Sequence, residues 1–125
     1  MERIKITVTG DPIPAARPRF NGRHAYQPAR NREYREAVRT AAVAAMDGLE
    51  PMTEEISATL KLYRRFKPTA RNFGDCDNHA KAILDGLNGI CFFDDAQVVK
   101  LTVEKYKDAE NPRAEIELSS RDSQK

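Results

Sequence analysis

The chain has 125 residues, a formal net charge of +2 and two cysteines, Cys76 and Cys91. This length predicts one domain over residues 1–125 with enough buried surface for a core, two cysteines exclude a disulfide framework, and no apolar run is long enough to span a membrane. Because the N-terminus enters an alternating pattern without a signal-peptide core, we expect a cytoplasmic protein that does not bind membranes.

The first half predicts a strand, a long loop and a helix. Apolar residues alternate with polar ones at Ile4, Ile6 and Val8, as in a half-buried strand. Residues 12–28 contain four prolines and one glycine, which predicts an irregular segment, and loops of this length are usually functional or disordered. Residues 29–47 predict a helix, because apolar residues recur every three or four positions at Tyr34, Val38, Ala41 and Ala45.

The second half predicts a strand, a helix and two further strands. Ile56 to Leu62 alternates like a strand, and Asp77 to Leu87 has helical spacing. Two strands, 97–106 and 114–118, are expected to form a hairpin through a turn at 108–113. The order β-α-β-α-β-β predicts an α+β fold with two helices on one small mixed sheet. The polar residues from about 119 to 125 are expected to fray.

Two segments carry basic residues and no acids. Residues 13–32 contain Arg17, Arg19, Arg23, Arg30 and Arg32, and residues 61–71 contain Lys61, Arg64, Arg65, Lys67 and Arg71. Such segments suit a phosphate-rich partner, although one segment alone is more often a solvated face. Arg17, Arg19 and Arg23 are candidate DNA contacts, with Phe20 and Tyr26 available for base stacking.

The second basic segment follows directly from the predicted strand 56–62. Continued alternation would turn Arg64 inward, where an unpaired charge is costly. We therefore expect the strand to end or twist near Tyr63. The basic residues would then emerge toward Asp75 and hold DNA phosphates without taking part in the chemistry; these are Arg64, Arg65, Lys67 and Arg71.

Two aspartate pairs stand at the starts of predicted elements. Asp75 and Asp77 begin the second helix, and Asp94 and Asp95 precede the strand that contains Val98. Residues two apart on an extended chain face the same side, so Asp75 and Asp77 would point to one place. An acid at a helix start also caps amide groups and complements the helix dipole, which explains Asp77 alone but not both pairs.

The pairs would converge if the strand ran beside the start of the helix. Clustered carboxylates bind hard divalent cations, and magnesium typically uses one or two of them with water and phosphate oxygens. Such a metal can activate water for phosphoryl transfer, and Lys81, on the same helix stripe as Asp77 and Asp85, could stabilise charge on the phosphate. The alternative is an ordinary acidic surface.

Other sites are less well supported by the sequence. A zinc site would need Cys76, His79, Cys91 and His24, but Cys91 lies in an apolar run and His79 is expected on the solvent side of its helix. No Walker-type loop is present, so no nucleotide cofactor is expected. Tyr34, Phe92 and Phe93 are most simply core residues.

Two ordered motifs resemble the RusA family of Holliday-junction resolvases, small magnesium-dependent endonucleases often found in phage and prophage genomes. The opening GDPIPAARPRF resembles the family's Gly-x-Pro-x-Pro-x-x-Arg-Pro-Arg. The segments DCDNHAKAILDGLN and FFDDAQVV resemble its Asp-x-Asp-Asn-x-x-Lys signature and the Asp-Asp-Ala-Gln-Val-Val that follows. The resemblance covers most of the chain.

The resemblance implies a homodimer with two active sites that nick opposed strands of a four-way DNA junction during recombination and repair. Asp75, Asp77 and Asp95 would bind Mg²⁺, with Mn²⁺ able to substitute, and Asp94 is the less certain member of its pair. Lys81 would be the catalytic lysine, supported by Asn78 and Asp85. The alternatives that stay open are a nuclease of other branched DNA and a non-catalytic DNA-binding accessory protein.

Overall fold

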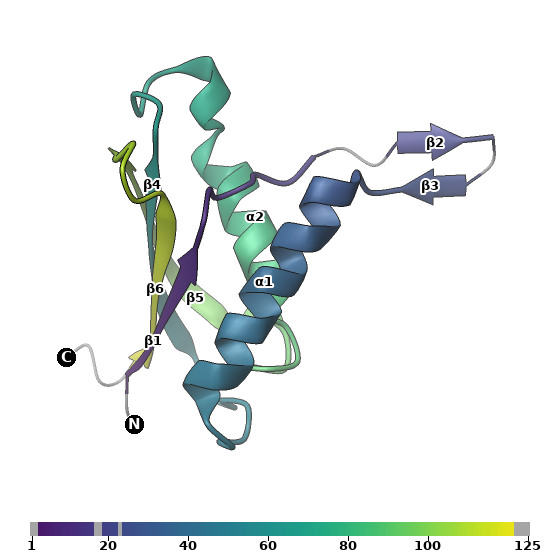
Figure 1. The fold of residues 1–125 in the computed structure, drawn as a ribbon. Coiled ribbons are helices and arrows are strands. Elements are labelled where there is room, and N and C mark those ends of the chain that lie inside the picture. Colours follow the sequence, from purple (N-terminus) through teal and green to yellow (C-terminus); the bar gives the residue numbers. More distant parts are fainter. Residues whose placement is uncertain (1–2, 17–18, 23, 122–125) are drawn as a thin grey trace.

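The computed structural model describes residues 3–16, 19–22 and 24–121. Within them the elements follow the chain as drawn in Figure 1. The strands are β1 (Ile4–Thr9), β2 (Arg19–Asn21), β3 (His24–Tyr26), β4 (Ile56–Arg64), β5 (Val98–Lys107) and β6 (Arg113–Ser120). The helices are α1 (Ala29–Met46) and α2 (Cys76–Leu87), with short 3-10 turns η1 (Arg71–Phe73) and η2 (Asp95–Gln97).

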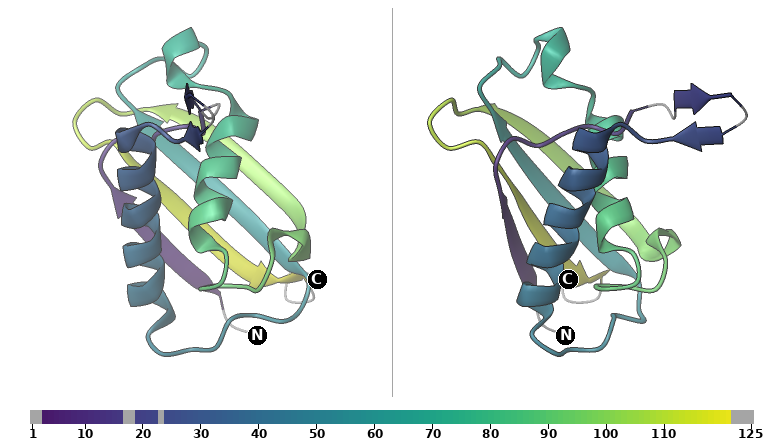
Figure 2. Two further views of the ribbon diagram at one scale, coloured as in Figure 1. Left: turned by 90° about the vertical axis from the view of Figure 1, so that its right-hand side faces the viewer. Right: turned by 45° about the vertical axis from the view of Figure 1, so that its right-hand side comes forward.

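The described residues form a four-stranded mixed sheet in the order β1-β6-β4-β5. β4 is parallel to β5 and antiparallel to β6, which is itself antiparallel to β1. Both long helices cover one face of this sheet (Figures 1 and 2). The predicted α+β class, with two helices on a small mixed sheet, is therefore confirmed.

The predicted hairpin between the last two strands is wrong. β5 and β6 are consecutive in the chain, but β4 lies between them in the sheet. The connection passes the end of β4, where the Asp108 N–H donates to the Arg64 carbonyl oxygen at 2.7 Å. Consecutive strands are usually neighbours, which is why the sequence favours a hairpin. β4 is largely buried, and a strand on each side satisfies its backbone hydrogen-bonding groups.

The core fills the space between the sheet and the helices. The helices contribute Tyr34, Val38, Ala42 and Met46 from α1, and Ala80, Ile83 and Leu87 from α2. The predicted α1 stripe is therefore slightly rotated, since Ala41 and Ala45 are only partly buried. A side chain at Gly86 would place its Cβ 2.6 Å from Val38 Cγ1, so this glycine lets the two helices approach closely.

The loop predicted over residues 12–28 contains a short hairpin. β2 and β3 pair antiparallel and project away from the sheet and helices as an arm (Figure 1). The sequence missed these strands because each is only three residues long. The side chains of Arg17, Arg19 and Arg23, the predicted DNA contacts of this segment, lie outside the part that the structure describes.

The C-terminal strand is longer than predicted. β6 continues through Ser119 and Ser120, both buried, and the Arg121 N–H donates to the Glu55 carbonyl oxygen at 2.9 Å. Fraying from residue 119, as the sequence suggested, is therefore wrong for the first residues of that tail. None of the described helices is both long and apolar enough to cross a membrane.

Candidate active site

Asp75 begins α2 but does not act as its cap. It occupies the N-cap position with extended backbone angles, and within the described residues its side chain accepts no capping hydrogen bond. The exposed carboxylate is therefore free for other ligands. Asp77, in the first turn, is also exposed, and its Oδ1 accepts the Asn78 N–H at 2.9 Å. Helix capping, the structural explanation for acids at a helix start, thus fails for Asp75.

A buried arginine supports the backbone just before Asp75. Arg64 is only 5% exposed and donates from Nε and Nη2 to the two carboxylate oxygens of Asp11, at 2.9 and 2.7 Å. Its Nη1 donates to the Phe73 carbonyl oxygen at 2.6 Å and to that of Asn72 at 3.3 Å. The prediction that Arg64 emerges to hold DNA is therefore wrong. Its charge is tolerated inside because a bidentate carboxylate and backbone carbonyls receive its hydrogen bonds.

His79 contacts the same carbonyl oxygen. It is 1% exposed, so its predicted position on the solvent side of the helix is wrong. Its Nε2 lies 2.7 Å from the Phe73 carbonyl oxygen, and because a carbonyl only accepts, this nitrogen carries the proton. Burial, opposed by this hydrogen bond, lowers the pKa of His79, and the positive charges of Arg64 and Lys105 lower it further. The imidazole is therefore neutral at pH 7.

Gly74 completes this support. Lys105 Nζ donates to the Gly74 carbonyl oxygen at 3.0 Å. Gly74 has a φ of +95°, and a Cβ there would lie 2.8 Å from His79 Nε2 and 2.9 Å from Pro14 Cγ. Only glycine fits this conformation and this space without displacing a neighbour. Residues 73 and 74 are thus fixed by side chains from distant elements, and this fixes where Asp75 begins.

Lys81 lies one turn further along the exposed side of α2. Its Nζ is 3.5 Å from Asp85 Oδ2, with both side chains largely in solvent. Such a pair contributes little stability, but it directs the ammonium group along the helix surface. The predicted orientation of Lys81 by Asp85 has this contact as its geometric basis.

The second aspartate pair divides into a cap and an exposed carboxylate. Asp94 Oδ1 accepts the Ala96 N–H at 3.2 Å, and Gln97 Oε1 accepts the Asp94 N–H at 3.0 Å, which together form a capping box at η2. Asp95 is exposed, and a hydrogen bond shared with Asp94 raises its pKa, as do slight burial and the nearby negative charges of Asp94 and Asp85. Asp94 therefore has a structural role that Asp95 lacks.

The two pairs do not converge within one chain. Lys105, near the end of β5, touches Gly74, whereas Asp94 and Asp95 precede the start of the same strand. Residues 98 to 105 span about 23 Å of strand. Among the residues that the structure describes, no three His, Cys, Asp or Glu side chains are grouped so that they could hold a metal ion. The convergence considered from the sequence therefore fails because α2 runs opposite to β5.

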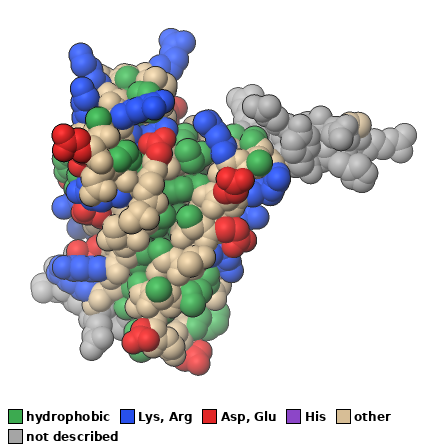
Figure 3. Space-filling model, viewed as in Figure 1, with side chains coloured by type: hydrophobic (Ala, Val, Ile, Leu, Met, Phe, Trp, Pro, Cys, Tyr) green, Lys and Arg blue, Asp and Glu red, His purple; other side chains and the backbone are tan. Residues whose placement is uncertain are grey.

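Exposed basic side chains lie close to the start of α2. Arg65, Lys67 and Arg71 are exposed, and Figure 3 shows Lys and Arg side chains gathered at the end of the molecule that carries η1. Arg65 lies over the Phe66 ring, 4.9 Å from its centroid. These three residues keep the exposure that a phosphate contact needs, in contrast to Arg64.

The two cysteines considered for a zinc site lie in different environments. Cys76 is exposed, while Cys91 is buried and its burial raises the pKa to about 11. The side chain of His24 lies outside the described part, and among the described residues no three potential zinc ligands are grouped. Phe93 is 64% exposed, contrary to prediction, whereas Phe92 and Tyr34 are buried as expected.

Sequence reasoning missed the residues that support the site. Asp11, His79 and Lys105 come from a loop, a helix and a strand far apart in the chain, and no local pattern marks them. One signal was present, since an inward arginine at the end of an alternating strand requires a carboxylate partner. Asp11, directly after the first predicted strand, was an available candidate.

Comparison with known proteins agrees with these motifs. Residues 9–119 match the family model of endodeoxyribonuclease RusA. The chain is also similar to an uncharacterized protein, YqaN, of Bacillus subtilis (strain 168), with 33% identity over 138 residues, covering 93% of this chain and 95% of that protein. The exposed aspartates at the start of α2, with Lys81 one turn on, lie inside the matched region. The chain belongs to the RusA family of endodeoxyribonucleases.

Proposed function

We propose that this protein is a Mg²⁺-dependent endodeoxyribonuclease that resolves four-way DNA junctions by paired nicking, in recombination and repair. The observation that carries the proposal is the Asp75 carboxylate, which stands at a helix start without capping it, on backbone fixed by Arg64, His79 and Lys105. A free carboxylate on a fixed support suits a metal ligand better than a structural role.

The donor set fits magnesium. Asp75 and Asp77, two positions apart in the chain, both expose their carboxylates, and magnesium is typically held by one or two carboxylates, with water and substrate phosphate completing the shell. When bound, the ion supplies an activated water and charge stabilisation for phosphodiester hydrolysis, and Mn²⁺ can replace it. Asp95 is the third proposed ligand, and Asp94 is committed to its capping box.

The chain's own residues would hold and orient the substrate. Lys81, directed by Asp85, places a positive charge where negative charge grows on the phosphate that is cut. Asn78 supports the geometry of the site, because its backbone carbonyl oxygen accepts the Ala15 N–H at 2.9 Å and ties the N-terminal segment to α2. Arg65, Lys67 and Arg71, together with Arg17, Arg19 and Arg23 of the arm segment, would hold the DNA backbone.

We propose further that a homodimer completes the site. β5 is one of the two edge strands of the described sheet, and exposed apolar side chains lie along it or next to it: Phe93 (64%), Val99 (42%) and Leu101 (44%). If two copies pair their β5 edges antiparallel, the start of β5 in one copy meets the end of β5 in the other. Asp95 would then approach Asp75 and Asp77 of the second copy. Two equivalent sites would follow from the two-fold symmetry, as paired nicking requires.

The test is a synthetic four-way junction incubated with the protein in Mg²⁺, in Ca²⁺ and in excess chelator. We expect cleavage in Mg²⁺ or Mn²⁺, binding without cleavage in Ca²⁺, and no cleavage in chelator. Asp75→Asn should abolish cleavage and keep junction binding and thermal stability, since its side chain makes no capping bond.

Asp94→Ala is the matched control, because it removes an aspartate that does cap the start of a helical turn. It should lower the unfolding free energy by about 1 kcal/mol, because it removes a capping side chain. Full cleavage by the Asp75→Asn variant would refute the role of Asp75 as a metal ligand, whereas junction binding with no cleavage under any metal would favour the accessory-protein alternative. Equal cutting of flaps and forks would favour a general branched-DNA nuclease.

A further inference from the structure

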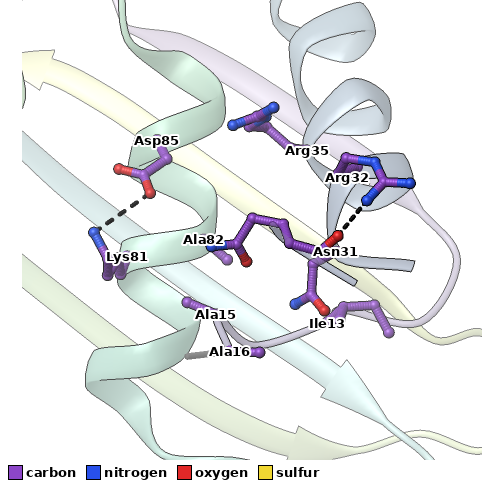
Figure 4. Close-up of a pocket in the computed structure, with 10 residues that line it drawn as sticks. Ile13, Ala15, Ala16, Asn31, Arg32, Arg35, Lys81, Ala82 and Asp85 are labelled. Atoms are coloured by element: carbon purple, nitrogen blue, oxygen red, sulfur yellow. Dashed lines mark hydrogen bonds and ion pairs between the residues drawn. The ribbon is translucent and has the colours of Figure 1, made fainter. Parts of the chain in front are cut away.

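A pocket separates the first turns of α1 from the exposed side of α2 (Figure 4). Its volume is about 100 Å³. Ile13 and Ala15 of the N-terminal segment form an apolar floor, Arg32 and Arg35 line it from α1, and Lys81 and Asp85 line it from α2. The pocket therefore adjoins the proposed active site through Lys81.

The floor of this pocket is tied to both helices. The Ala15 N–H donates to the Asn78 carbonyl oxygen of α2 at 2.9 Å. Asn31 Nδ2 of α1 donates to the Pro14 carbonyl oxygen at 2.9 Å. Because each helix holds the same short segment, the walls keep their spacing, and the pocket is a fixed feature of the fold.

The charges around the pocket favour an anion. Three cationic side chains line it against one carboxylate among the described lining residues, Asp85, which leaves two positive charges in excess. Asp85 already lies 3.5 Å from Lys81 Nζ. Arg32 donates from Nη1 to the Gln27 carbonyl oxygen, and Arg35 forms no ion pair with any described residue. The apolar floor strengthens attraction to a bound anion, because it lowers the local dielectric.

The size of the pocket narrows the kind of anion. Sites for cofactors and drug-sized ligands typically measure roughly 300 to 1,000 Å³, so about 100 Å³ is too small for a nucleotide but suits a single phosphate group. Arginine is well matched to this ligand, since its planar fork of donors pairs with two phosphate oxygens at once.

We propose that Arg32, Arg35 and Lys81 bind one phosphodiester group of the DNA that is not itself cut. This inference rests on the proposed nuclease function and adds to it two residues from outside the predicted DNA contacts. Lys81 lines the pocket and also belongs to the proposed active site, so the bound phosphate would neighbour the one that is hydrolysed. Such a contact sets the register of the strand and carries no base preference.

The test combines a protein variant with a chemical change in the DNA. Junctions carrying one uncharged methylphosphonate linkage, moved stepwise along the cleaved strand, are titrated in Ca²⁺ with wild type, Arg35→Ala and Arg30→Ala. Arg30 is the matched control, because it is an exposed arginine of the same helix that does not line the pocket. Circular dichroism verifies that both variants fold.

We expect Arg35→Ala to weaken junction binding by roughly three- to tenfold at low salt and to lower the salt slope by about one unit. At one linkage, near the cut, the methylphosphonate should weaken binding by wild type and Arg30→Ala more than binding by Arg35→Ala, which has already lost one of the three proposed contacts. This non-additivity identifies the contact.

Losses that add at every linkage would overturn the phosphate site, even if Mg²⁺-dependent cleavage is found. Conversely, if the losses of binding are non-additive at one linkage but no cleavage is found in any metal, the phosphate site stands and the proposed nuclease function is refuted. The two proposals therefore fail separately.

Discussion

Arg64 illustrates how a single tertiary contact changes the role of a side chain. From the sequence it belongs to a basic segment that would hold DNA, because no partner stands near it in the chain. In the fold it is buried against Asp11, 53 residues away, and both groups act on the backbone before Asp75. Its neighbour Arg65 is exposed and stays a candidate DNA contact. The two adjacent arginines thus differ in burial and in their expected roles.

We predict that Arg64→Met lowers the unfolding free energy by about 1 to 3 kcal/mol, because the buried Phe73 carbonyl oxygen loses a hydrogen bond. Asp11 adds little to this loss, since its side chain is 41% exposed and water can hydrate the released carboxylate. Arg65→Ala should leave stability unchanged and reduce the salt slope of junction binding by about one unit. Urea denaturation and binding titrations over a salt series measure the two effects. If the Arg64→Met variant is stable and its junction binding has a reduced salt slope, Arg64 contacts DNA and does not support the fold.

At the scale of elements, the connection between β5 and β6 decides the sheet order. Asp108 Oδ1 accepts the N–H groups of Glu110 and Asn111, at 3.1 and 3.0 Å, and Oδ2 accepts a hydrogen bond from Arg113 Nη1 at 3.0 Å. The Asn111 N–H and the Arg113 guanidinium favour the carboxylate, so the pKa of Asp108 lies below its ordinary value. One side chain thus shapes the turn that carries the chain past β4.

The lowered pKa of Asp108 has a defined effect on stability. Because the folded state binds this proton less readily than the unfolded state, the carboxylate stabilises the fold above its ordinary pKa of about 3.9, and this contribution is lost as pH falls through the lowered value. Asp108→Asn should therefore be less stable than wild type at neutral pH, and the difference should shrink in acid. Urea denaturation at about pH 7 and pH 3 measures it. A difference that stays constant with pH would show that the charge of Asp108 is not involved.

For the whole molecule, the central question is how Asp95, the proposed third metal ligand, could reach Asp75 and Asp77. Within one chain, Asp95 lies toward one end of β5 and Asp75 toward the other. A two-fold dimer along β5 would join them from different copies. This arrangement can be tested without a structure of the dimer, because it predicts how inactive variants behave when they are combined.

We predict that Asp75→Asn and Asp95→Asn, each inactive alone, recover nicking of one strand when they are mixed and allowed to exchange subunits. In a mixed dimer with shared sites, both substitutions fall in one site and the other site is intact. Junction nicking on a denaturing gel measures the recovery. If all ligands of a site came from one chain, the mixture would stay inactive. Leu101→Glu is the control, since a charge on the β5 edge should weaken dimerisation and abolish the recovery.

Much of the molecule followed from the sequence because it depends on local patterns. Alternation at Ile56 to Leu62 and helical spacing at Ala80, Ile83 and Leu87 predicted elements that form as expected, since each buries one continuous face. The ordered motifs around Asp75 and Asp95 also identified the family before any geometry was known.

Only the tertiary structure decided which charges are buried and which elements are neighbours. β4 separates β5 from β6, His79 and Arg64 are buried, and Asp94 caps a turn while Asp95 is exposed. Each of these depends on partners far apart in the chain, such as Asp11 for Arg64 and Phe73 for His79. The sequence predicts which residues belong inside by their polarity. A buried charge is stable only when a specific distant group pairs with it, and no local pattern records that pairing.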